Sequence, residues 1–222
     1  MDKEITSTEL MDIFSMMLER FGKRFWWPGD SPLEIVIGCI LTQNVTWKNV
    51  EEAIINLKKC NLIDTQAIIS IPVEELGQLL KSTRYYMQKA INLKNFCIRL
   101  NEGFDGSLDN LFTMDTPKLR KYLLSLRGIG KETADSIILY AANKPIFVVD
   151  AYTKRIFSRL GYFNKDSTYD EVQDFFTENF SHDLYLYNEF HALIVCLGQN
   201  CCKNTKPLCS SCVLENKCKK TY

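Results

Sequence analysis

The sequence predicts an all-α protein, and three of its features indicate that class. Apolar residues recur at helical spacing along most of the chain. No stretch alternates apolar and polar residues for long enough to form a strand of a sheet. Glycines and short polar runs, as in 103–106 and 164–167, separate the helical segments. We therefore expect about ten helices joined by short loops.

Residues that favour the first turn of a helix mark where several of these segments begin. A longer apolar stripe between them consists of Tyr86, Ala90, Leu93, Cys97 and Leu100. Thr46 begins a segment with Trp47, Val50, Ile54 and Leu57 on one face, and Ser70 with Pro72 begins a short helix. Thr116 with Pro117 begins a segment that contains Leu119, Leu123 and Leu126. Thr168 can form a capping box with Glu171, and Val172, Phe175 and Phe176 follow.

Composition limits the classes of protein that this chain can belong to. Its 222 residues suffice for one large domain or two small ones with cores. No stretch approaches the roughly 18–20 apolar residues of a membrane span, and the N-terminus lacks the regions of a signal peptide. We expect a cytoplasmic location and no membrane partner. With 27 basic and 27 acidic residues, bulk charge does not favour nucleic-acid binding, which would need local patches and backbone amides.

Six of the nine cysteines fall within residues 196–218. In a cytosolic chain such a cluster indicates metal binding before disulfides. Cys39, Cys60 and Cys97 stand apart among apolar neighbours, and we expect them to be small core residues.

Four cysteines of this group follow the spacing C-x6-C-x2-C-x5-C. Closely spaced thiolates of this kind suit a [4Fe–4S] cluster or a structural zinc ion, and the spacing alone does not choose between them. Cys196 and Cys201 are additional. The four are Cys202, Cys209, Cys212 and Cys218.

A glycine-containing turn interrupts two helical patterns, over 117–125 and 131–142. Gly128 and Gly130 flank Ile129 and permit a tight turn with positive φ. Such a turn directs backbone N–H groups outward at a helix N-terminus, which makes an anion site suited to a phosphate, and Lys131 adds a positive charge beside it. A Gly-x-Gly segment is also compatible with a plain connector between helices.

A carboxylate follows about twenty residues after this hairpin, where Val148-Val149-Asp150 comes after a break at Pro145. The segments that carry a family resemblance are Leu126-Arg127-Gly128-Ile129-Gly130, then Thr133-Ala134, then Val149-Asp150. Together they resemble the helix-hairpin-helix and Gly/Pro-Asp pattern of the endonuclease III superfamily. The loop at 143–145 departs from that pattern because it lacks the usual glycine.

The resemblance covers nearly the whole chain, from Leu41-Thr42-Gln43-Asn44 to the last cysteine. It implies a base-excision DNA glycosylase of two helical lobes that acts on double-stranded DNA, and we expect a monomer. The first lobe would be a six-helix bundle over 29–143 that ends in the hairpin. The second would join 1–28 to 144–222 and hold the cysteine cluster, with DNA in the cleft.

The same resemblance selects a [4Fe–4S] cluster, because the cysteine spacing matches the cluster loop of endonuclease III and its adenine-mismatch relative. It also favours Cys202 over Cys201 as the first ligand. The implied role is structural: the cluster would fix a basic surface for DNA phosphates. That surface would consist of Lys203, Lys206, Lys217, Lys219 and Lys220.

The resemblance makes Asp150 the catalytic carboxylate, although an isolated aspartate on a loop is more often a turn or cap residue. Its charge would stabilise an oxocarbenium-like transition state, and it could orient or deprotonate water. Bifunctional members also use a lysine two residues after the second hairpin glycine. Glu132 stands there, at the mouth of the expected cleft with Asp150, while Lys131 lies one helical step of about 100° away.

We therefore expect a monofunctional glycosylase that activates water. Two alternatives stay open. The first is a bifunctional glycosylase and lyase of the endonuclease III type that acts on oxidised pyrimidines. The second is a non-catalytic iron–sulfur protein that binds DNA or serves in redox chemistry.

Base recognition requires a residue that fills the gap left by a flipped nucleotide and a surface on which the base stacks. Gln43 matches the family's inserted glutamine, and it could instead be a polar helix end. The run Phe25-Trp26-Trp27-Pro28 offers aromatic stacking partners from Trp26, Trp27 and Pro28, or simply core packing.

Relatives that excise 3-methyladenine have a similar Trp-Pro element and a hairpin glutamate, although they lack the cluster loop. Aromatic faces favour a cationic alkylpurine. Tyr152 replaces the histidine that follows the catalytic aspartate in endonuclease III. We expect removal of alkylated purines, with thymine or uracil mispairs and oxidised pyrimidines still open.

Overall fold

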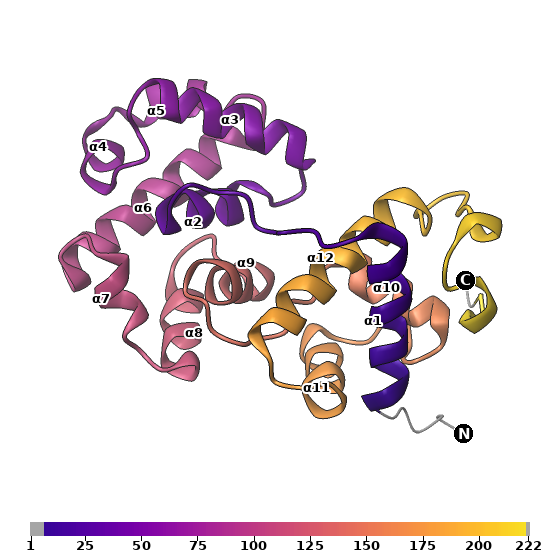
Figure 1. Ribbon diagram of the computed structural model, residues 1–222. Coiled ribbons are helices and arrows are strands. Elements are labelled where there is room, and N and C mark those ends of the chain that lie inside the picture. The colour runs from indigo at the N-terminus through magenta and orange to yellow at the C-terminus, as the bar shows by residue number, and fades with distance from the viewer. Residues whose placement is uncertain (1–6, 221–222) are drawn as a thin grey trace. The chain divides into compact units, whose positions relative to one another are not determined.

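The computed structural model describes residues 7–220, and in this range all regular structure is helical with no strand (Figure 1). This confirms the all-α prediction. The described chain forms two compact units, one of residues 27–144 and one that joins 7–26 to 145–220. The sequence analysis placed Trp27 and Pro28 in the second lobe. In the structure they belong to the unit 27–144.

The unit 27–144 contains eight α-helices, where six were expected, and a short π-helix. The number is higher because the chain breaks at Ile71 and Pro72 into two short helices, and because α7 is a separate five-residue turn. The helices are α2 (Pro32–Leu41), α3 (Trp47–Lys59), α4 (Thr65–Ser70), α5 (Val73–Leu79), α6 (Tyr86–Phe104), α7 (Leu108–Phe112), α8 (Thr116–Ser125), α9 (Lys131–Ser136) and the π-helix η1 (Ile137–Ala141).

Helix α6 is the long central helix of this unit and packs against α2, α4, α5 and α7. Its apolar stripe, predicted from Tyr86 to Leu100, supplies fully or almost fully buried Leu93, Phe96 and Leu100. The segment predicted as one helix over 131–142 is α-helical only to Ser136 and continues as the π-helix, whose hydrogen bonds span one residue more per turn.

Short polar side chains begin most of these helices. Ser31 accepts from the backbone N–H of Glu34 ahead of Pro32. The start predicted at Thr116 is capped one residue earlier, by Asp115, whose carboxylate accepts from the N–H of Lys118. The capping box of Thr168 and Glu171 is confirmed at α11 (Tyr169–Asn179) of the other unit.

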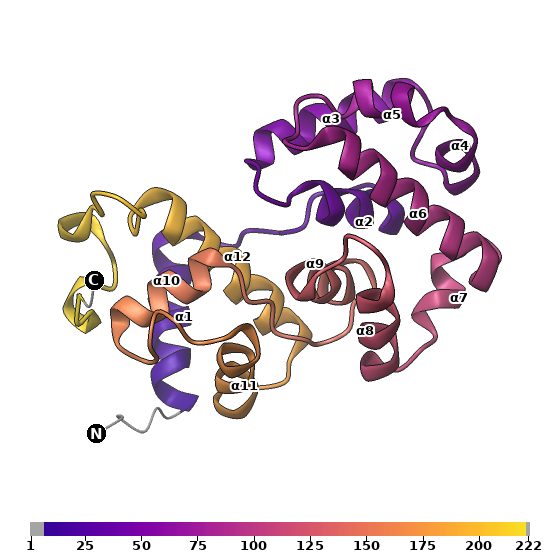
Figure 2. The ribbon, with the colours of Figure 1, turned by 180° about the vertical axis from the view of Figure 1, so that it is seen from behind.

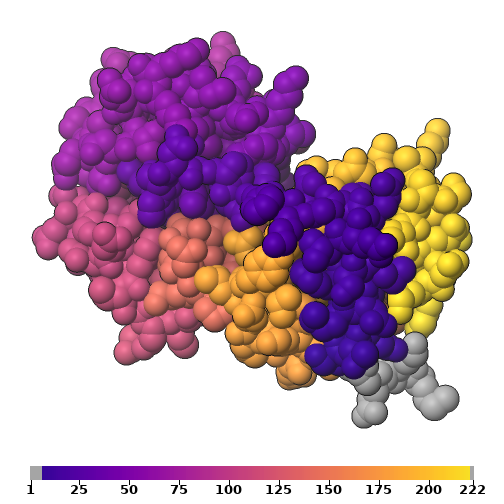
Figure 3. Space-filling model, viewed as in Figure 1, coloured from indigo at the N-terminus to yellow at the C-terminus, as the bar shows by residue number. Residues whose placement is uncertain are grey.

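The unit of 7–26 and 145–220 contains α1 (Ser7–Phe21), α10 (Ala151–Leu160), α11, α12 (Leu184–Asn200) and the 3-10 turns η2 (Cys209–Ser211) and η3 (Glu215–Lys217). Helix α12 packs against both α1 and α10, as both ribbon views show (Figures 1 and 2). In the space-filling view, α1 lies along the surface beside the C-terminal cysteine segment (Figure 3). The N-terminal helix is thus part of the same unit as the C-terminal segment.

Aromatic rings form the core of this unit. Phe147 and Phe176 stack with centroids 3.9 Å apart, and Phe157 and Phe190 pack edge-on against Phe176. All four are fully buried. Rings of this size bury much apolar area and favour offset or edge contacts, so they hold α10, α11 and α12 in fixed register.

Two of the three isolated cysteines, Cys39 and Cys97, are buried as predicted, and burial raises the pKa of the Cys97 thiol to about 12. The prediction for Cys60 was wrong, because its side chain is exposed. Cys60 follows the last residue of α3, where the chain turns away from the core.

A buried ion pair joins the two helices of the hairpin. The guanidinium of Arg120 on α8 donates to both carboxylate oxygens of Asp135 on α9, at 2.7 and 3.1 Å. Asp135 has no exposed surface. The two-bonded geometry fixes one helix against the other more firmly than a single contact would.

Replacing Arg120 by methionine should lower the free energy of unfolding by about 3 kcal/mol, because a buried carboxylate loses its guanidinium partner. Urea denaturation measures this loss. Lys121→Met, at the adjacent exposed position of α8, is the matched control and should change the free energy by less than about 0.5 kcal/mol. Equal urea midpoints for the two variants would refute the role of the ion pair.

Candidate active site and cysteine site

The hairpin between α8 and α9 turns at Gly128, whose φ is +85°. The expected positive φ occurs at this glycine only, because Gly130 is extended, with φ −91° and ψ 179°, and caps α9. The N–H of Ile129 donates to the carbonyl of Leu126 at 3.2 Å, and the Ile129 side chain is buried. Ile129 therefore anchors the turn while both glycines are exposed.

A side chain of helix α6 supports this turn. A Cβ added to Gly128 would lie 2.0 Å from Nδ2 of Asn92, so only glycine fits there. Asn92 is held in turn by Gln88, which donates to its side-chain carbonyl at 2.8 Å. Asn92 was not anticipated as a site residue. The sequence held no signal for it, because its burial and its contact with Gly128 depend on the packing of α6.

Gln43 lies against the hairpin. Its Nε2 donates to the carbonyl of Gly128 at 2.9 Å and to Oγ1 of Thr133 at 3.0 Å. Lys89, also on α6, donates through Nζ to the carbonyls of Leu41 and Gln43 at 2.8 and 2.9 Å. Burial lowers the pKa of Lys89 to about 8. The structure therefore brings Gln43 and the hairpin together, and Lys89 is a second residue that sequence reasoning missed.

Lys131 and Glu132 are the first two residues of α9, and both are exposed. They belong to the unit 27–144, whereas Asp150 belongs to the other unit.

Trp27 packs inside the unit 27–144. Its ring meets Trp47 edge-on at 5.2 Å and Tyr140 at 5.3 Å. A Cβ added to Gly38 would lie 2.8 Å from Nε1 of Trp27, so the glycine makes room for the indole. Tyr140 comes from the π-helix, a type of turn that is frequent at functional sites. Trp26 is partly exposed and Pro28 is exposed.

Asp150 caps the N-terminus of α10. Its Oδ1 accepts from the backbone N–H of Thr153 at 2.7 Å and from Oγ1 of Thr153 at 2.8 Å. Its Oδ2 lies 3.6 Å from Nε2 of His191 on α12. Burial acts to raise the pKa of Asp150, but His191 and the Thr153 donors outweigh it and hold the pKa below its usual value. The carboxylate is therefore ionised at neutral pH.

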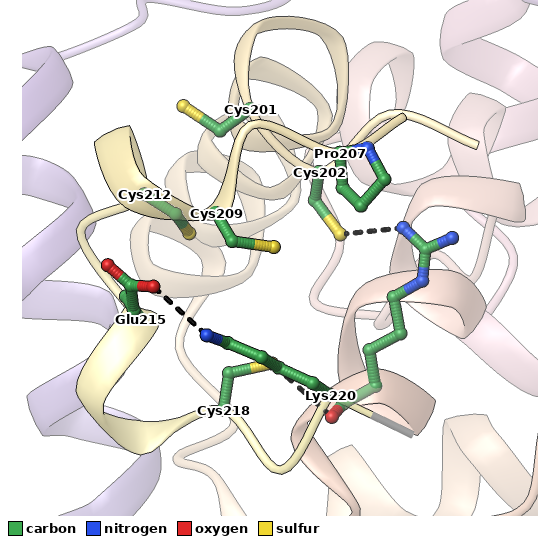
Figure 4. Close-up of a pocket in the computed structure, with 9 residues that line it drawn as sticks. Cys201, Cys202, Pro207, Cys209, Cys212, Glu215, Cys218 and Lys220 are labelled. Atoms are coloured by element: carbon green, nitrogen blue, oxygen red, sulfur yellow. Dashed lines mark hydrogen bonds and ion pairs between the residues drawn. The ribbon is translucent and has the colours of Figure 1, made fainter. Parts of the chain in front are cut away.

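Five cysteines line one cavity, namely the four predicted ligands and Cys201 (Figure 4). The sulfurs of Cys202, Cys209, Cys212 and Cys218 surround a common space, while that of Cys201 points away. The Cys201 thiol lies 3.8 Å from the carbonyl of Ser211. In the described residues, no three His, Cys, Asp or Glu side chains are placed to hold a single metal ion as they stand.

Two arginines of α10 hold the segment that begins at Cys202. Arg155 donates through Nε to the carbonyl of Cys202 at 2.9 Å. Arg159 donates to Sγ of Cys202 at 3.3 Å and to the carbonyl of Lys203 at 2.8 Å. The lysines predicted to form a basic surface, Lys203, Lys206, Lys217, Lys219 and Lys220, are all exposed.

A glycine-turned hairpin, a capping aspartate and a four-cysteine cavity on an all-helical chain define a helix-hairpin-helix repair protein. A family described as the HhH-GPD superfamily base excision DNA repair protein matches residues 37–182. The chain belongs to this family, and it is accordingly an enzyme with DNA N-glycosylase activity. None of its described helices is long and apolar enough to cross a membrane.

Individual relatives agree with this assignment. A protein of Methanocaldococcus jannaschii, whose name assigns it provisionally to the DNA repair glycosylases, is 42% identical over 97% of this chain and 98% of its own. The endonuclease III of Sulfolobus acidocaldarius is 29% identical over 83% of this chain and 80% of its own.

Among solved structures, an endonuclease III trapped covalently on DNA shares the fold, with a TM-score of 0.83, 24% identity and 97% of each chain covered. The 3-methyladenine DNA glycosylase MagIII of H. pylori, bound to 1,N6-ethenoadenine, has a TM-score of 0.75 and 28% identity. The match covers 86% of this chain and 96% of that one.

Replacing Gly128 by alanine should lower the free energy of unfolding by at least about 2 kcal/mol, because it combines a left-handed backbone with overlap on Asn92. Gly130→Ala is the matched control: nothing lies within 4 Å of its added Cβ, and a loss under about 1 kcal/mol is expected. Urea denaturation compares the two. A control that is as unstable as Gly128→Ala would contradict this account of the turn.

Proposed function

We propose that this chain is a monofunctional DNA glycosylase that removes an alkylated purine from double-stranded DNA by activating water. The observation that carries the proposal is the buried Asp150, whose pKa is held below its usual value. The sequence adds a glutamate, Glu132, at the position where bifunctional relatives have their lysine. The chemistry of both positions, and of the residues around them, supports it.

Asp150 supplies the charge that cleavage of a base–sugar bond needs. The sugar becomes cationic as the base departs, and a carboxylate in a water-poor environment stabilises that cation strongly. The pKa of Asp150 is held below its usual value, so at neutral pH the side chain can also accept the proton of an attacking water. Oδ1 serves the helix cap, which leaves Oδ2 for this task.

Glu132 argues against the lyase reaction. A Schiff base requires a neutral amine that can attack the sugar, and a glutamate cannot form one. Lys131 precedes it by one residue, about 100° around α9, and is exposed. We assign Lys131, with the backbone amides of Gly128 and Gly130, to a DNA phosphate. The expected amide of Ile129 is left out of this set, because it donates to the carbonyl of Leu126. We assign Gln43 to the gap left in the duplex.

The aromatic residues around Trp27 favour an alkylated purine over an oxidised pyrimidine. Trp27 packs with Trp47 and Tyr140, and Trp26 and Pro28 adjoin it in the sequence. A methylated purine carries a positive charge, which aromatic faces attract. MagIII, at 28% identity, is a 3-methyladenine DNA glycosylase. The relatives named endonuclease III favour the bifunctional alternative, so a test must separate the two.

A panel of duplexes should identify the reaction, each carrying 3-methyladenine, thymine glycol, uracil or thymine opposite guanine. We expect excision of the alkylpurine, strand breakage only after alkali, and no covalent adduct when borohydride is added with abasic DNA. Asp150→Asn should slow excision about 10²- to 10⁴-fold, whereas Asp166→Asn, at an exposed loop position of the same unit, should not.

Each part of the proposal has its own contrary result in that panel. A trapped adduct would establish the bifunctional alternative. Unchanged excision by Asp150→Asn would remove the catalytic role of that residue. Binding of every duplex with excision of none would favour the non-catalytic alternative.

The cysteine site fits a [4Fe–4S] cluster. Four thiols surround one cavity (Figure 4), and such donors bind iron–sulfur clusters as thiolates. Burial raises the pKa of the Cys212 thiol to about 11, so a positively charged group is needed to keep that sulfur deprotonated at neutral pH. When bound, the cluster would cross-link the segment that presents the five exposed lysines, whose charges suit DNA phosphates.

Protein purified without oxygen should be brown, with broad absorption near about 400 nm. Cys202→Ser should lose most of the iron and the colour, because it removes one of the four converging thiols. Cys201→Ser, next to it in the sequence, should keep both, because its sulfur points away. A colourless, zinc-loaded protein, or loss of iron in Cys201→Ser alone, would overturn the assignment.

A further inference from the structure

Asp150 has a buried partner that the reaction described above does not use. His191 comes from the middle of α12 and is 5% exposed, and Asp150 is 8% exposed. The two oxygens of the carboxylate face different neighbours. Thr153 of α10 donates twice to Oδ1, and His191 approaches Oδ2 alone, with 3.6 Å between Nε2 and Oδ2.

At that distance His191 can stabilise the negative charge of Asp150 without a direct hydrogen bond to Oδ2. A direct N–H···O bond is about 2.7–3.2 Å long, so the two atoms lie beyond it while remaining within ion-pair range. Oδ2 thus has a cationic neighbour when His191 is protonated, and it keeps lone pairs for the proton of a water molecule.

The position of His191 is fixed by the core. Phe190, the preceding residue, is fully buried and packs against Phe147, Phe157 and Phe176. Helix α12 also packs along α10, which carries Asp150 at its N-terminus. The imidazole of His191 on α12 therefore faces the carboxylate of Asp150 at the start of α10.

We propose that His191 is the positioning residue of the glycosylase reaction, and that it holds Asp150 charged and oriented with Oδ2 available to water. This inference rests on the proposed function, because it assumes that Asp150 acts on the sugar or the water. Without His191, the buried carboxylate would lose its nearby cation and keep the two Thr153 donors. The pKa of Asp150 would rise, and its neutral, inactive form would persist to higher pH.

The test compares His191→Leu, His191→Gln, Asp150→Asn and the parent protein in single-turnover release of 3-methyladenine from methylated duplex DNA, between pH 5 and 8. His191→Leu should slow release about tenfold to a hundredfold and move the acidic limb of the rate profile to higher pH, with DNA affinity unchanged. His191→Gln, which keeps an N–H donor without the charge, should recover part of the rate. Tyr187→Phe, one turn earlier on α12, is the control for disturbance of the helix and should behave as the parent.

A second measurement needs no substrate. The carboxyl carbon of Asp150, followed by NMR through an acid titration, should titrate at higher pH in His191→Leu than in the parent, and the two thermal melts show that both proteins are folded. Should both titrate alike, the inference is refuted, whatever the activity. It is refuted too if His191→Leu and the parent share one rate profile while Asp150→Asn is inactive. If Asp150→Asn stays fully active, the proposed function fails instead, and the titration still decides whether His191 charges Asp150.

Discussion

The structure depends most on how it keeps an ionised carboxylate inside an apolar unit. Burying a lone charge is so unfavourable that the group would otherwise take up a proton. Asp150 is 8% exposed, and Thr153 and His191 replace the stabilisation that water would have given. The result is a buried Asp150 carboxylate whose pKa lies below its usual value. That combination is what an acid group needs in order to act on a developing cation.

In the unit 27–144, buried polar side chains support the exposed turn at Gly128. Lys89 and Asn92 lie on the buried face of α6, among residues that otherwise form an apolar stripe. Lys89 satisfies the last carbonyls of α2, and Asn92 fills the space beneath Gly128. Each side chain has its partners, so these buried polar groups specify one arrangement of the hairpin and of Gln43.

The cysteine segment is irregular, with two short 3-10 turns, and it lacks a core of its own. The arginines of α10 tie its backbone to the rest of the unit, and four thiols converge inside it. A loop of this kind gains rigidity from a metal cross-link in the way that small domains do. The exposed lysines around it would then present their charges from fixed positions.

The sequence by itself determined the helical class, the capping box at Thr168, the glycine turn and the spacing of the C-terminal cysteines, because each follows from local geometry or from spacing along the chain. Only the tertiary structure decided that Lys89 and Asn92 support the turn, that Trp27 packs with Trp47 and Tyr140, and that His191 faces Asp150. These pairs lie far apart in the sequence, and no local pattern encodes them. Cys60 illustrates the same limit. It was predicted to be a core residue, but it lies at the C-terminal end of α3, where its side chain is exposed. Burial and charge stabilisation depend on which helices pack together, and packing is a property of the whole fold.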